Sequence, residues 1–108
     1  MKMRKKNVRG FLAISLIGDM EVFDAEQFEE ATTALIKKGQ KNIVIDFEGL
    51  NYISSSGLRA LINIRALIEK EGGRLVLAAL KDKVLEVFRI SKLLSIFEVV
   101  QGIDTLPD

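Results

Sequence analysis

Three consecutive serines, Ser54, Ser55 and Ser56, are the residues of this chain best suited to chemistry. They follow an apolar run and precede residues with the apolar spacing of a helix, which predicts that they lie at a helix N-terminus. Unpaired backbone N–H groups and the positive end of the helix dipole stabilise an added anion at such a place. A hydroxyl there is therefore a candidate for phosphorylation. Serine is also among the best N-cap residues, so a purely capping role is the competing interpretation.

The sequence contains neither histidine nor cysteine. This excludes a Ser-His-Asp triad, a histidine general base and thiolate chemistry, and it leaves only carboxylates for a zinc site, which is rare. We therefore expect no catalytic residues, no cofactor and no metal, and we predict that the protein is not an enzyme. Lack of disulfides makes the cytoplasm the simplest expected location.

The composition is typical of one soluble domain over residues 1–108, with 48% hydrophobic and 29% charged residues. It contains no apolar run of membrane-spanning length and no secretory signal, so membrane insertion is not expected. Five of the sixteen Lys and Arg residues lie in the first nine positions. They could contact nucleic acid or an anionic membrane surface. We interpret them instead as a solvated strand edge or an irregular terminus, because no aromatic residues are interleaved for base stacking.

Strands and helices are predicted to alternate along the chain. Strands are expected over 11–17, ended by a Gly18-Asp19 turn, and over 42–47, 74–79 and 96–100. Helices are expected from a cap at Asp24 to Gly39, over 56–71, and from a cap at Asp82 to Ile90. This alternation predicts an α/β fold with a four- to five-stranded mixed sheet and helices mainly on one side. The residues expected to be buried are Phe28, Val44, Ile45, Leu61, Ile62 and Val76.

The stretch from Val44 to Leu58 resembles the signature of the STAS domain, which bacterial anti-sigma factor antagonists share with sulphate transporter tails. The shared pattern is a buried strand, an acidic and apolar turn, and a Ser-Gly-Leu motif that opens a helix. The stretches 11–18, 72–75 and 84–97 fit further family features in the right order. The resemblance covers nearly the whole chain and implies a single STAS domain. The short length favours the stand-alone antagonist branch.

In that family the Ser or Thr after a motif Asp is phosphorylated by an anti-sigma factor that is also a serine kinase. The resemblance implies that this protein binds such a kinase, that Ser55 is the phosphoacceptor, and that phosphorylation ends the binding. It also leaves room for a serine phosphatase as a partner. The chain departs from the family pattern because Ser54 replaces the motif Asp and Glu21 stands where Asp is usual. The expected partner contacts are Gly18, Asp19, Met20, Glu21, Asp24, Ser54, Ser56, Gly57, Leu58 and Arg59.

Two other functional classes stay open. The chain could be a STAS subunit of another assembly, such as a lipid-transport ATPase or a stress-signalling complex, in which the serines are never phosphorylated. Loss of the motif Asp favours that alternative. The Ser-Ser-Ser-Gly turn could also cradle the phosphate of a nucleotide in an enzyme. The Gly-x-x-x-x-Gly-Lys spacing and a general base are missing, which disfavours this class.

Overall fold

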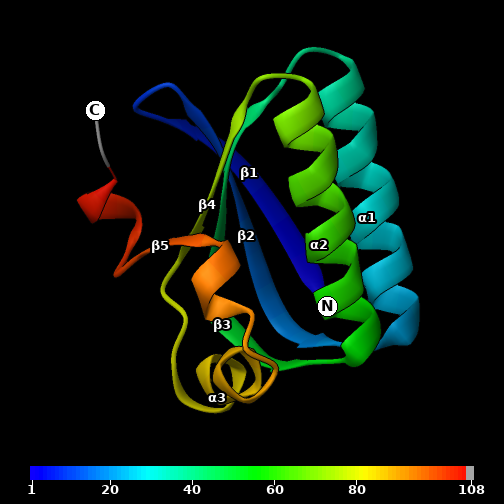
Figure 1. The fold of residues 1–108 in the computed structure, drawn as a ribbon, viewed down its shortest axis with the longest axis vertical. Coiled ribbons are helices and arrows are strands. Elements are labelled where there is room, and N and C mark those ends of the chain that lie inside the picture. Colours follow the sequence, from blue (N-terminus) through cyan, green and yellow to red (C-terminus); the bar gives the residue numbers. More distant parts are fainter. Residues whose placement is uncertain (107–108) are drawn as a thin grey trace.

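Five strands and three helices form the α/β fold of the computed structural model, which describes residues 1–106 (Figure 1). The sheet order is β1-β2-β3-β4-β5; β1 is antiparallel to β2, and all other neighbours are parallel. This confirms the predicted mixed sheet. Residues 107 and 108 of the expected domain lie outside the described residues. The elements are β1 Lys2–Val8, β2 Phe11–Met20, α1 Val22–Lys37, β3 Asn42–Ile53, α2 Ser55–Lys70, β4 Arg74–Ala78, α3 Asp82–Ile90 and β5 Glu98–Val100.

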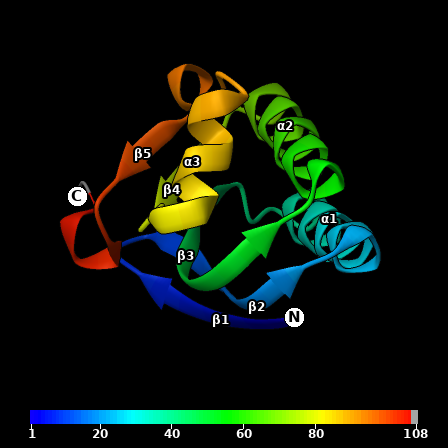
Figure 2. The same cartoon turned by 90° about the horizontal axis from the view of Figure 1, so that it is seen from below.

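The three helices cover one face of a curved sheet, as the view from below shows (Figure 2). The main core lies between the helices and this face, and three phenylalanines are fully buried in it, Phe28, Phe47 and Phe88. A smaller cluster on the opposite face includes Phe11, Val44 and Val76, and Leu106 at the end of the described chain packs against it. The short C-terminal segment thus covers part of the face that the helices leave open.

The basic N-terminal stretch forms the edge strand β1, which is one of the two interpretations of these residues. It pairs with β2 in an unbroken register from Lys2 opposite Ile17 to Val8 opposite Phe11. Arg9 and Gly10 connect the two strands, with φ angles of 50° and 84°. These angles fit the two-residue hairpin turn in which both central residues have positive φ.

Burial agrees with the prediction at every expected core position except Ile62, which is 38% exposed. The helix α2 turns its buried side to the sheet through Leu58, Leu61, Ile64 and Ile68, at intervals of three and four residues. Ile62 follows Leu61 by about 100° around the helix axis and therefore lies toward solvent. The expected apolar face of this helix was too wide by one residue.

Two predicted strand ends were wrong. Gly18 and Asp19 form no turn, because β2 continues through them to Met20 and keeps its pairing with β3. The pairing shifts register between Ser15 and Ile17 and again after Gly18, whose φ of 105° suits glycine. The acidic and apolar stretch after Phe47 is likewise part of β3, which continues to Ile53.

Two predicted helix caps were also displaced. The helix α1 begins after Glu21, and Asp24 instead lies in its first turn, where its carboxylate accepts a hydrogen bond of 2.9 Å from the Glu21 backbone N–H. This satisfies one free donor at the helix start. In α3 the cap position is occupied by Lys81, and Asp82 is the first helical residue. The carboxylates of Asp24 and Asp82 thus lie inside the first turns of their helices instead of at the cap positions. There they interact favourably with the positive end of the helix dipole.

Candidate functional site

The turn that carries the serines lies beside the segment that connects β2 to α1. The neighbouring parallel strands β2 and β3 end together, with Met20 opposite Ile53. The next residue, Ser54, donates a backbone hydrogen bond of 2.9 Å to the Met20 carbonyl. Figure 2 shows both strands passing into α1 and α2 at this end of the sheet. Residues 18–24 and 54–59 therefore form one continuous region, which we call the serine surface.

The three serines have different environments. Ser54 is 6% exposed, and its Oγ accepts a hydrogen bond of 3.2 Å from the Gly57 backbone N–H, so it is the N-cap of α2. Ser55 is the first residue of α2 and is exposed, while Ser56 is half-buried. Because Ser54 performs the capping, the Ser55 hydroxyl is left open to solvent at the helix N-terminus.

Gly57 holds the start of α2 against the ends of the two strands. A Cβ atom at this position would come within 2.6 Å of Ile53 Cγ1 and 2.7 Å of Met20 Sδ. Contacts that short do not occur in real proteins, so only glycine allows this approach without a shift. The close approach fixes the position of Ser55 and Ser56, at the start of α2, relative to the ends of the two strands.

The serine surface also contains charged residues. Asp19 and Glu21 are exposed in the segment that follows β2. Asp24 is half-buried, and its carboxylate also lies 3.5 Å from the N-terminal ammonium of Met1. Arg59 is exposed one helical turn after Ser55, and residues four apart lie on the same side of a helix. The surface thus combines acidic groups from one segment with a single arginine from the other.

Not every expected contact residue presents its side chain to solvent. Met20 and Leu58 are buried in the main core, and Gly18 and Gly57 contribute only backbone. These four residues shape the serine surface from beneath. The expected contact residues with exposed side chains are Asp19, Glu21 and Arg59.

Three exposed apolar residues lie in or beside the segments of the serine surface and were not singled out from the sequence, although Val22 and Phe23 fall within the expected contact loop 18–24. Val22 and Phe23 begin α1, and Phe23 is 69% exposed. Tyr52 is exposed on β3 opposite Asp19. Phe23 does not share the spacing of the buried residues of α1, which begin at Ala25, and this was the available signal. Exposed aromatic residues are frequent anchors of protein interfaces, so this edge suits protein contact better than small-molecule binding.

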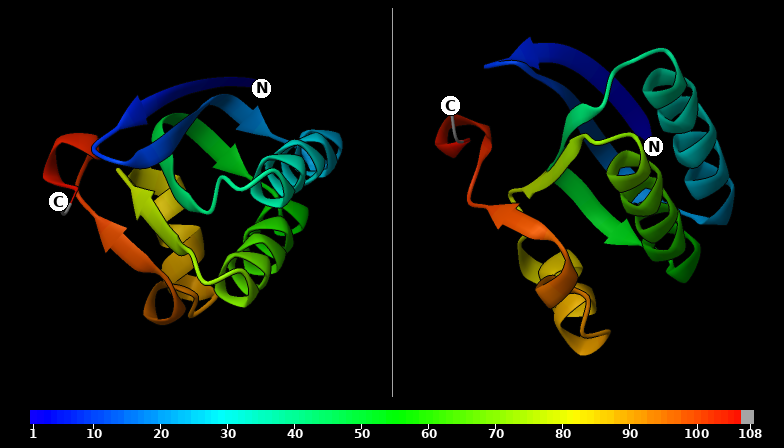
Figure 3. Two further views of the ribbon diagram at one scale, coloured as in Figure 1. Left: turned by 90° about the horizontal axis from the view of Figure 1, so that it is seen from above. Right: turned by 45° about the horizontal axis from the view of Figure 1, so that its top comes forward.

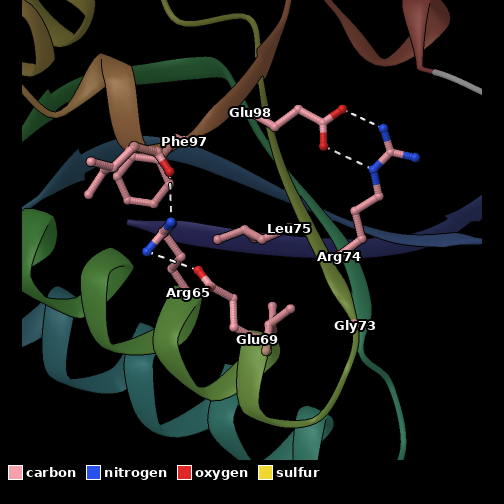
Figure 4. Close-up of a pocket in the computed structure, with 9 residues that line it drawn as sticks. Arg65, Glu69, Gly73, Arg74, Leu75, Phe97 and Glu98 are labelled. Carbon is pink, nitrogen blue, oxygen red and sulfur yellow. Dashed lines mark hydrogen bonds and ion pairs between the residues drawn. The ribbon is translucent and has the colours of Figure 1, made fainter.

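A hollow between α2, β4 and β5 is a structural feature rather than a ligand site (Figure 4). Arg65 pairs with Glu69 at 2.9 Å, and Arg74 binds both carboxylate oxygens of Glu98 at 2.9 and 2.5 Å. The Arg74 hydrogen bonds lower the pKa of Glu98, against the weaker opposing effect of its partial burial, and the same bonds raise the pKa of Arg74. The charged groups in this hollow already have internal partners.

Residues 1–106 contain no group of three or more carboxylates that could hold a metal ion. Their helices include none that is both long and apolar enough to cross a membrane.

Comparisons with known proteins identify the family. The sequence model of the STAS domain matches residues 2–106. BtrV of Bordetella bronchiseptica, provisionally named an anti-sigma factor antagonist, is 40% identical over 102 residues, which cover 94% of this chain and 88% of BtrV. The anti-sigma-B factor antagonist of Staphylococcus aureus is 22% identical over 92 residues, or 85% of each chain. The solved structure of the Bacillus cell fate determinant SpoIIAA in its phosphorylated form has a TM-score of 0.75 at 23% identity and covers 95% of both chains. The chain therefore belongs to the STAS domain family.

Proposed function

We propose that this protein is an anti-sigma factor antagonist, which binds an anti-sigma factor with serine kinase activity and is switched off when that kinase phosphorylates Ser55. The observation that carries the proposal is the position of Ser55. It is the first residue of α2 and is exposed, while Ser54 caps the helix. The family membership and the names of the relatives support the antagonist role.

The switch needs no change of fold. A phosphate adds about −1.5 to −2 charges and three strong acceptor oxygens. At Ser55 it would lie at the positive end of the α2 dipole, where a negative charge is stabilised. The exposed guanidinium of Arg59 is one turn away on the same side of the helix. The phosphate would therefore act on a docked partner by its bulk and by pairing with the Arg59 guanidinium.

The serine surface supports a protein partner with a basic and an apolar part. Asp19 and Glu21 offer exposed carboxylates to a basic face, and the exposed Phe23 offers an apolar anchor beside them. The protein acts as a binding module and contributes no catalysis. The partner kinase acts in the cytoplasm, and a serine phosphatase removes the phosphate to restore binding.

Phosphorylation by the cognate kinase tests the proposal. Incubation with that kinase and ATP should add about 80 Da, one phosphate of the kind found on regulated serines, and the phosphate should map to Ser55. Ser55→Ala should prevent the modification and still bind the kinase, whereas Ser55→Asp should bind at least about tenfold more weakly, which is about 1.4 kcal/mol. Ser54→Ala and Ser56→Ala are the matched controls and should remain substrates. A phosphate on Ser54 or Ser56 would show that the assigned position is wrong.

The role of a STAS subunit in another assembly is the second candidate, and Ser54 favours it. This residue stands where the family has the motif Asp, and its hydroxyl is buried and occupied by the Gly57 N–H. The turn therefore lacks a carboxylate that could orient the acceptor hydroxyl for a kinase. Purification with an ATPase instead of a serine kinase, together with no phosphate on Ser55, would favour this second function over the first.

A further inference from the structure

The edge strand β1 is a second surface suited to a partner, separate from the serine surface. It is seven residues long, pairs with β2 on one side only, and shows no break in register. In Figure 3 no other segment of residues 1–106 lies along its outer side. Native proteins usually protect such an edge by charged side chains, shortness, proline, a bulge or a covering segment. Within the described residues, β1 has only its charges.

The outward-facing backbone groups of β1 follow from the hairpin geometry. In a two-residue hairpin the residues that flank the turn, here Val8 and Phe11, exchange backbone hydrogen bonds. Along the strand, one residue directs its N–H and C=O groups toward β2, and the next directs both groups away from it. The residues that direct them away from β2, to the free edge, are Met3, Lys5 and Asn7.

The side chains of β1 place cations on both sides of this free edge. Val8 packs on the sheet face opposite the helices, and alternation puts Lys2, Arg4 and Lys6 on the same face. Lys5 lies on the other face. Arg4 and Lys6 also border a hollow of about 460 Å³ that extends over Ser15 and Ile17, so they adjoin open space rather than packed side chains.

Two carboxylates, Asp46 and Glu48, line the same hollow but form no ion pair with the cations of β1. Asp46 accepts hydrogen bonds from the Ser15 hydroxyl at 3.3 Å and from the Glu48 backbone N–H at 3.0 Å. Glu48 forms an ion pair with Lys81. The ion pairs found among residues 1–106 include none from Lys2, Arg4, Lys5 or Lys6. The four cations of β1, a strand without an acidic residue, thus have no ion-pair partner among residues 1–106.

The positive charge of β1 determines which kind of partner fits its free edge. A second copy of β1 would place cation against cation, which is destabilising across paired strands. Single-stranded nucleic acid that binds without sequence preference stacks its bases on aromatic side chains, and β1 contains no aromatic residue. An extended polypeptide with carboxylates at alternate positions matches both the unpaired backbone groups and the cations.

We propose that β1 binds an acidic, extended segment of a partner protein by strand addition. Backbone groups of the added strand bond to Met3, Lys5 and Asn7, and its alternate carboxylates lie against Lys2, Arg4 and Lys6 on the open face. Binding at this edge leaves the serine surface free, so the protein can hold two partners at once.

A blocked eight-residue peptide of alternating Glu and Thr is the probe, with titration followed by amide chemical shifts of the whole protein. We expect the largest shifts on β1 and an affinity that falls with salt. Replacing both Arg4 and Lys6 with Gln should weaken binding about tenfold or more.

The matched pair Lys5→Gln and Lys5→Pro separates charge from backbone, because both remove the cation and only proline removes the outward N–H. Proline is tolerated at an edge where the N–H faces solvent. Lys5→Pro should bind at least about tenfold more weakly than Lys5→Gln.

A second measurement leaves the protein unaltered. Two versions of the same peptide are N-methylated on alternate backbone nitrogens, one on the Glu residues and the other on the Thr residues. Each keeps its charge but loses half of its backbone donors. The version that lacks the donors facing β1 should bind at least about tenfold more weakly than the other. Equal binding of both methylated peptides, or equal binding by Lys5→Pro and Lys5→Gln, would overturn strand addition. So would binding to vesicles of anionic phospholipid without binding to the peptide. Ser55→Asp should bind the peptide as the unmodified protein does, and this result keeps the test independent of the proposed kinase switch.

Discussion

The backbone N–H of Ser54 and the carbonyl of Met20 are joined by a hydrogen bond of 2.9 Å, which ties the start of α2 to the end of β2. These residues are 34 positions apart in the sequence, yet each comes directly at the end of one of two neighbouring parallel strands. The acidic segment after β2 and the serine turn are therefore held side by side. Any partner that contacts Ser55 also meets the segment that includes Asp19 and Glu21.

The capping role of Ser54 predicts a stability difference between adjacent serines. Ser54→Ala removes the acceptor of the Gly57 N–H and should lower the free energy of unfolding by about 0.5–2 kcal/mol. Ser55→Ala, at an exposed position, should change it by less than about 0.5 kcal/mol. Urea denaturation of the two variants measures both effects. An equal loss in both would contradict the assignment of the cap.

The two apolar residues at positions 61 and 62 should respond very differently to truncation. Leu61 is fully buried between α2 and the sheet, so Leu61→Ala should cost about 2–5 kcal/mol of unfolding free energy. Ile62→Ala removes a side chain that faces solvent and should cost less than about 1 kcal/mol. Chemical denaturation of both variants compares the two sides of the same helix. A larger loss at Ile62 would contradict the orientation of α2.

The acidic part of the serine surface should govern the rate of partner association. Replacing Asp19 and Glu21 with Lys should slow association with the partner kinase and flatten its dependence on salt, because long-range attraction to a basic face is lost. Stopped-flow mixing at several salt concentrations measures both quantities. Unchanged rates in a variant that remains folded would remove this segment from the interface.

Phe23 should govern how long the complex lasts. Truncation of an aromatic anchor typically costs 1 kcal/mol or more, so Phe23→Ala should raise the Kd about tenfold, mainly through faster dissociation. Val99→Ala is the matched control, since Val99 is also an exposed apolar residue but lies on β5. Surface plasmon resonance with the immobilised kinase separates the two rates. Equal losses from both substitutions would argue against a specific anchor.

The ion pair between Arg74 and Glu98 predicts a loss of stability in acid. The pKa of Glu98 is lower in the folded protein than its ordinary value, so the contribution is complete above the ordinary glutamate range and disappears as the pH falls through the folded pKa. The urea midpoint of the wild type should exceed that of Glu98→Gln at about pH 6, and the difference should shrink as the pH falls below the ordinary glutamate range. A constant difference across this range would show that the gap does not come from the ionised pair.

The pattern of apolar residues in the sequence correctly predicted the buried strands and the ends of two helices. The buried runs that contain Val44 and Val76 became strands, and Gly39 and Gly72 follow the helices they were expected to end. Periodicity failed where tertiary pairing decides the outcome. Gly18 signals a turn locally, but β2 keeps its hydrogen bonds to β3 by shifting register there. The width of a helix face also depends on its neighbours, and Ile62 lies just beyond the region of α2 that the sheet covers.

The serine turn was predictable because a cap, a glycine and an apolar helix follow one another without a gap. Which serine performs the cap required coordinates, since all three hydroxyls have the same chemistry. The exposed pair Val22 and Phe23 could not be assigned to a surface while the start of α1 was set at Asp24. The residues just before a supposed cap belong to a loop, whereas the actual start makes them the first turn of a helix.

The guanidinium of Arg9 donates a hydrogen bond of 2.8 Å to the carbonyl of Leu106, and Leu106 covers the Phe11 side of the sheet. During synthesis the β1-β2 hairpin and the main core can assemble as soon as Phe97 has left the ribosome, because Phe97 is the last residue in this core. The cluster around Phe11, Val44 and Val76 must wait for residue 106. A nascent chain stalled between these two points would leave the side chains of this cluster without the cover that Leu106 provides.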